Sequence, residues 1–84
     1  MAQKALNVDL SVEAQFLIAH DTIVRAVNEV YDVRNSDLAT LVTICLDGHG
    51  HLPKTKRYLF GERVSNAQLD FIETTTQAVL ASNP

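Results

Sequence analysis

Hydrophobic residues recur at helical spacing in four segments of the chain, which short polar or glycine-containing connections separate. The first segment, from about residue 11 to 31, is the longest. Ser11 is its expected N-cap, because a serine hydroxyl accepts a hydrogen bond from a first-turn N–H. Its apolar side chains form one stripe and should face a core, while Ile18 falls on the polar side. The stripe consists of Val12, Phe16, Leu17, Ile23, Val24, Val27, Val30 and Tyr31.

The second helix is expected from about 37 to 47, after the candidate caps Asn35 and Ser36. Gly48 is placed to stop it in the left-handed conformation that glycine adopts without strain. The predicted inner face consists of Leu38, Leu41, Val42, Cys45 and Leu46.

Two further helices follow from their end signals. Pro53 suits the first position of a short third helix, and Gly61 ends that helix. The run 65–68 is a capping box for the fourth helix, in which Val64 is placed to pack on Leu69. The fourth inner face consists of Leu69, Ile72, Val79 and Leu80, whereas the β-branched run 74–76 needs packing to remain helical.

These signals predict an all-α fold: a compact bundle of four helices, one long, one medium, one short and one medium. At 84 residues the chain has room for one domain over 1–84, with 1–10 as an N-terminal arm and 81–84 as a tail. A core of this size leaves a net stability of only a few kcal/mol, so a protein partner or a homo-oligomer fits the chain.

Composition agrees with a folded domain, since 46% of the residues are apolar and 20% are charged. The single cysteine, Cys45, excludes an internal disulfide and favours a reducing compartment, with the cytoplasm as the default. The first ten residues lack the apolar run of a signal peptide, and no stretch approaches the roughly 20 apolar residues of a membrane span.

Charge is distributed unevenly along the chain. Residues 49–63 carry a net charge of +3 while the whole chain carries −3, so the remainder carries −6. Such a basic patch on an acidic body selects partners by electrostatic steering. We therefore expect a partner-binding surface on the short third helix and next to it, with Phe71 as an exposed anchor unless the third helix covers it. Its residues are Lys54, Lys56, Arg57, Tyr58 and Phe71.

The second and third helices also invite a helix-turn-helix interpretation, and hence DNA as the partner. Against DNA stand the acidic pI of about 5.4 and the few Asn and Gln side chains that the third helix offers to base edges.

The histidines raise the questions of metal binding and of a pH-sensitive role. Cys45, Asp47, His49 and His51 alternate near the end of the second helix, but their spacing matches no paired zinc-ligand pattern, so no metal is expected. His20 lies within the first apolar stripe. The favoured interpretation is a core histidine bonded to a carbonyl or carboxylate, with a pH-sensitive role as the alternative.

No nucleophile elbow, phosphate loop or dinucleotide fingerprint is present, so no enzyme activity and no cofactor are expected. Several runs instead resemble the accessory helical region that follows the catalytic core in many bacterial Fic-family proteins. The matching features are Phe16-Leu17 with Asp21 and Arg25, the turn 33–38, the runs 41–46 and 50–57, Phe60, and Leu69 to Glu73. The resemblance covers about four fifths of the chain and implies a helical accessory module.

Residues 47–51 echo the Asp-Gly-Asn-Gly-Arg part of the Fic catalytic motif without its chemistry. Thr43 stands where that motif has its general-base histidine, and His51 stands where it has a phosphate-binding arginine. We therefore expect a non-enzymatic interaction or regulatory module that binds a protein. A DNA-binding regulator and a phage-type inhibitor are the alternatives.

Overall fold

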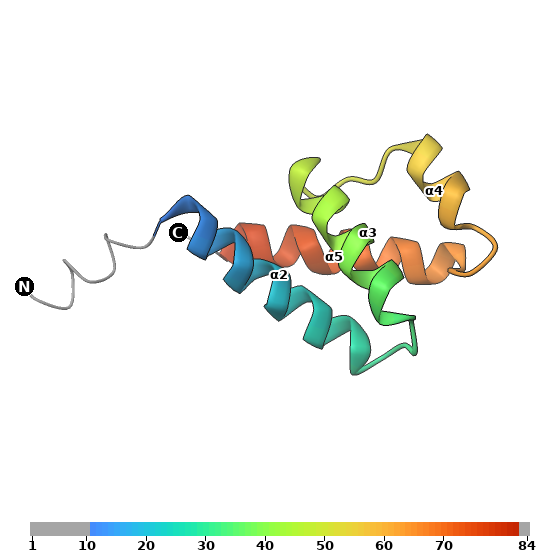
Figure 1. The fold of residues 1–84 in the computed structure, drawn as a ribbon, viewed down its shortest axis with the longest axis horizontal. Helices are drawn as coiled ribbons and strands as arrows, with labels where there is room; N and C mark the ends of the chain where they lie inside the picture. The colour runs from blue at the N-terminus through green and yellow to red at the C-terminus, as the bar shows by residue number, and fades with distance from the viewer. Residues whose placement is uncertain (1–10, 83–84) are drawn as a thin grey trace, which may run out of the picture.

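The computed structural model describes residues 11–82, which form four helices and no strand (Figure 1). The helices are α2 (Val12–Asn28), α3 (Asn35–Asp47), α4 (Lys54–Phe60) and α5 (Asn66–Ser82). The expected all-α, four-helix fold is thereby confirmed, except that α5, expected to be of medium length, has 17 residues, as many as α2. The predicted arm 1–10 lies outside the described residues. The predicted tail 81–84 is wrong for its first two residues, because α5 continues through Ser82. Residues 83–84, like the arm, lie outside the described residues.

Three of the four helices build the core. α2, α3 and α5 each pack against the other two, whereas α4 has no buried residue and lies to one side (Figure 1). α3 and α4 are joined by residues 48–53 and do not form a closely packed pair, as the helices of a helix-turn-helix unit would. The core consists of Ile23, Val27, Val33, Leu38, Leu41, Val42, Cys45, Leu52, Val64, Leu69 and Ile72.

α2 begins as expected and ends early. The Ala14 N–H donates to the Ser11 hydroxyl over 3.0 Å, which confirms the predicted cap. The helix ends at Asn28 rather than near 31, and the Tyr31 N–H closes the following turn on the Val27 carbonyl. Both buried residues of α2, Ile23 and Val27, lie in its second half.

The predicted inward stripe of α2 is therefore wrong at three positions. Val12, Leu17 and Val30 are 81%, 67% and 58% exposed. Val12 lies in the first turn, at the end of the molecule away from α3 and α4 (Figure 1), and Val30 lies in the turn after the helix. Periodicity identifies a side of a helix, but it does not say how much of its length the other helices cover.

The start of α3 differs from the prediction. Asn35 is already helical, and Arg34 occupies the N-cap without a side-chain hydrogen bond, so neither Asn35 nor Ser36 caps the helix. The first turn instead contains Asp37, whose negative charge suits the positive end of the helix dipole.

The end of α3 is a Schellman motif displaced by one residue from the predicted stop. Gly48 has a φ of −93°, so it is not left-handed; His49 and Gly50 have φ values of 56° and 98°. The Gly50 N–H donates to the Cys45 carbonyl over 2.7 Å, and the His49 N–H donates to the Leu46 carbonyl, as the motif requires. Gly50 also permits a close approach, since a Cβ there would lie 2.6 Å from Gln77 Cγ.

α4 and α5 begin nearly where expected. Pro53 is the N-cap of α4 rather than its first residue, and Gly61 follows its last turn. The capping box is confirmed: the Gln68 N–H donates to the Ser65 hydroxyl, and the Ser65 N–H donates to the Gln68 side-chain oxygen. The β-branched run remains helical, with Thr76 fully buried.

Candidate functional site

Arg57 fastens α4 to the body of the protein. Its side chain lies largely buried between α4 and α5, with Nη1 2.8 Å from Glu73 Oε1 and Nη2 2.8 Å from Asp70 Oδ1. An arginine that spans two carboxylates forms directional, charge-assisted hydrogen bonds. Two acidic residues of the same chain thus already pair with the guanidinium of Arg57, and its partner-binding role stays a prediction.

The connection that leads into α4 depends on the same carboxylate. Glu73 Oε2 accepts the Leu52 N–H over 2.7 Å, while its other oxygen accepts from Arg57. Leu52 is buried, so its N–H needs this partner. Glu73 thus holds both the connection before α4 and the middle of α4.

A second ion pair fixes the chain after α4. Arg63 donates through Nε to Asp37 Oδ2 over 2.8 Å and through Nη2 to Asp37 Oδ1 over 3.1 Å. The hydrogen bonds from Arg63 hold the pKa of the Asp37 carboxyl below its usual value, although partial burial acts in the opposite sense. The guanidinium also lies 5.7 Å from the centre of the Phe60 ring.

These pairs change the predicted basic patch. Two of its arginines are neutralised by acidic side chains that the fold brings from α3 and α5. Lys54 and Lys56 are exposed and form no salt bridge within residues 11–82. Few free cations therefore remain for nucleic-acid phosphates.

The expected exposure of Phe71 is wrong, while its partner-binding role stays a prediction. It is half-buried, packs against the core, and meets the Tyr31 ring edge-on at a centroid distance of 5.4 Å. The ring contact of Phe71 therefore comes from Tyr31, in the turn after α2, and not from a residue of α4.

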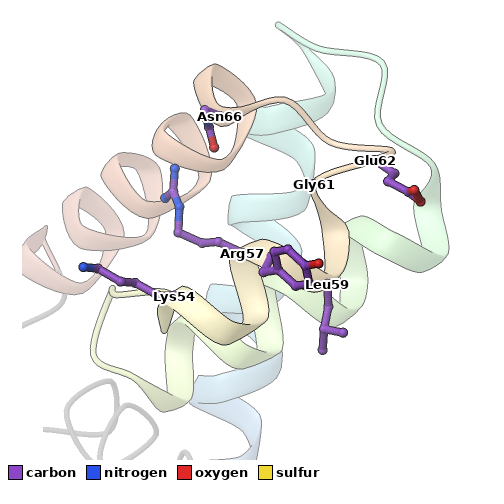
Figure 2. Close-up of a pocket in the computed structure, with 7 residues that line it drawn as sticks. Lys54, Arg57, Leu59, Gly61, Glu62 and Asn66 are labelled. Atoms are coloured by element: carbon purple, nitrogen blue, oxygen red, sulfur yellow. The ribbon is translucent and has the colours of Figure 1, made fainter.

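Unlike Phe71, two large side chains on the outward side of α4 are mostly exposed to solvent. Tyr58 is 85% exposed and Leu59 is 63% exposed, although both are large and partly or wholly apolar. They line an open hollow of about 660 Å³ between α4 and the start of α5 (Figure 2). We call four of its exposed residues, Lys54, Tyr58, Leu59 and Glu62, the α4 surface.

The sequence did not identify Leu59 or Glu62 as site residues. Leu59 lies one residue beyond the basic run, and its exposure follows from how Arg57 orients the helix. Glu62 entered the sequence interpretation only through the net charge of residues 49–63, which its negative charge lowers. Neither position has a local pattern that would have revealed its role, because the hollow forms only when α4 meets the start of α5.

His20 makes the hydrogen bond that the favoured interpretation required. Its Nε2 lies 3.0 Å from the Ala39 carbonyl oxygen, and its ring is 6.2 Å from that of Phe16. The side chain is half-buried rather than within the core. This bond ties α2 to α3, while the pH-sensitive role stays a prediction.

Cys45 is a buried free thiol. Burial raises its pKa, the nearby Thr76 hydroxyl acts in the opposite sense, and the Glu73 charge raises it further. A thiol with a raised pKa is a poor nucleophile and a poor metal ligand at neutral pH. Within residues 11–82 no three His, Cys, Asp or Glu side chains are placed to share a metal ion.

Comparisons with known proteins add no assignment. No protein-family model matches the chain, and neither does any curated protein or solved structure. Of the helices within residues 11–82, none combines the length and apolarity needed to cross a bilayer.

Proposed function

We propose that this chain is a non-enzymatic helical module that binds a partner protein through the α4 surface. The observation that carries the proposal is the orientation of α4. A surface helix normally turns its apolar residues inward and its charges outward. In α4 the charge of Arg57 is directed inward to Glu73, while Tyr58 and Leu59 face solvent.

The side chains of the α4 surface suit a protein partner. Tyrosine combines a large apolar ring with a polar hydroxyl and is enriched among the residues that dominate binding energy. The hollow beside Tyr58 offers a concave site for a partner side chain. Lys54 lies at the edge of the hollow and adds a positive charge that helps to orient a partner, whereas Lys56 does not line the hollow.

The resemblance to the Fic accessory region supports a role for this module beside a nucleotidyl-transferring Fic core. Thr43 and His51, which replace the base and the phosphate-binding arginine of the Fic motif, support a role without catalysis for this chain. A cytoplasmic location belongs to the same proposal.

Affinity purification of the tagged full chain from its native host, followed by mass spectrometry, tests this proposal. The Tyr58→Ser/Leu59→Ser double variant should lose the captured partner. The matched control is Leu17→Ser/Ile18→Ser, which changes two comparably exposed apolar residues on α2 and should retain it. Equal capture by the wild type and the α4 variant would refute the proposal.

A further inference from the structure

We propose that the α4 surface binds a second copy of this chain, with the two α4 helices antiparallel about a two-fold axis. This inference rests on the proposed function, since it names the partner of the same surface. It is carried by the order of charges along α4, which a single molecule does not explain.

The α4 surface has opposite charges at its two ends and apolar side chains between them. Lys54 is the first residue of α4, and Glu62 follows its C-terminal end. Figure 2 shows Lys54 at one end of the hollow, Glu62 at the other, and Leu59 between them. In an antiparallel pair each Lys54 meets the Glu62 of the other copy, so one contact occurs twice, as a two-fold interface requires.

Within one molecule the same charges are unfavourably placed. A cation at the start of a helix and an acidic residue after its end both oppose the helix dipole. Neither Lys54 nor Glu62 forms a salt bridge within the described part of the chain. Within the monomer the Glu62 charge acts only through space on the neighbouring Arg63, whereas an antiparallel pair gains two ion pairs.

The local charge balance favours a second copy over a purely acidic partner. Beside Lys54 and Lys56 lie Glu62 and the group formed by Arg57 with Asp70 and Glu73, in which two carboxylates share one guanidinium. The surface is therefore close to neutral and has separated charges, which suits a partner with the same separation. Tyr58 and Leu59 of each copy would form the apolar centre.

The small size of α4 predicts a weak interface. Seven residues of helix span only about 10 Å, so the buried area should lie below the roughly 1,200 Å² of standard interfaces. We expect a reversible dimer, with a dissociation constant in the micromolar to millimolar range.

Sedimentation equilibrium of the full chain, at about 10 µM to 1 mM, tests the inference in the range of weak association. Lys54→Glu and Glu62→Lys should each weaken dimerisation by about tenfold or more, because each places like charges together twice. The double exchange should restore dimerisation to within about threefold of the wild type. Lys56→Glu is the matched control: it changes the charge equally on the same helix, outside the hollow, and should have little effect. Circular dichroism checks that each variant keeps its helix content.

A wild-type chain that stays monomeric, or single reversals that leave dimerisation unchanged, would overturn the inference. Failure of the double exchange to restore dimerisation would do the same. If the chain is monomeric but the α4 variant still loses a captured partner, this inference fails and the proposed function stands. If neither dimerisation nor capture depends on α4, both fail.

Discussion

The core helices and α4 are stabilised in different ways. α2, α3 and α5 bury apolar side chains against one another, whereas α4 has no fully buried residue. It is held by the ion pairs of Arg57 and, just beyond its end, Arg63, together with Phe60, which packs partly buried against the core. Because the ion pairs supply much of this attachment, Tyr58 and Leu59 are not needed for it and remain exposed for a partner.

The largest loss of stability is expected when a side chain of the apolar core is truncated. Leu41→Ala should lower the free energy of unfolding by about 2–5 kcal/mol, because Leu41 is fully buried and its truncation leaves a cavity. Urea denaturation followed by circular dichroism measures this loss. A change below about 1 kcal/mol would mean that the three-helix core is not the main source of stability.

A smaller and local effect is expected when the attachment of α4 is broken. Glu73→Ala removes the partner of both the Leu52 N–H and Arg57, and should cost about 1–3 kcal/mol. Hydrogen exchange should become faster in residues 52–60 while α2 and α5 remain protected.

Asp70→Asn is the control for that variant, because it weakens only the more exposed contact of Arg57 and should cost less than about 1 kcal/mol. Equal loss of protection in all four helices of the Glu73 variant would show that α4 and the core unfold as one unit.

The ion pair between Arg63 and Asp37 predicts a dependence on pH. Since the folded state lowers the pKa of Asp37, this pair stabilises the fold above the unfolded pKa of about 3.9. That contribution is lost as the pH falls through the lower, folded value. Asp37→Asn should therefore be less stable than the wild type near neutral pH, and the difference should shrink below about pH 4. Thermal unfolding at a series of pH values measures it; a constant difference would contradict the assignment.

The smallest effect on stability is expected on the outward side of α4. Tyr58→Ser should change the free energy of unfolding by less than about 0.5 kcal/mol, because its side chain is almost fully exposed. The same urea titration checks this value. A loss comparable to that of Glu73→Ala would show that Tyr58 belongs to the attachment of α4 rather than to a binding surface.

Sequence signals within one or two helical turns, such as caps and hydrophobic periodicity, predicted most of the helix positions. The capping box at Ser65 and the inward positions of α3 depend on residues within one or two helical turns, and the structure has both. The start of α3 was missed because Arg34 caps it without a side-chain bond, so no residue type marked the boundary.

The site was harder to predict because its determinants are far apart in the sequence. Arg57 meets a carboxylate sixteen positions away, and Arg63 meets one twenty-six positions away. Charge counting along the chain therefore overestimated the basic patch. The exposure of Phe71 was misjudged for the same reason, since its ring partner, Tyr31, lies in the turn after α2, far from it in the sequence.

Because the only cysteine is buried, the rate at which its thiol reacts can report how often the core opens. Cys45 is fully inaccessible, so a thiol reagent in solution can reach it only after the structure around it opens. The rate of labelling in native buffer would then report how often the core opens, at one chemically unique position and without an engineered probe. When reagent is in excess and closing is slow, that rate equals the opening rate itself.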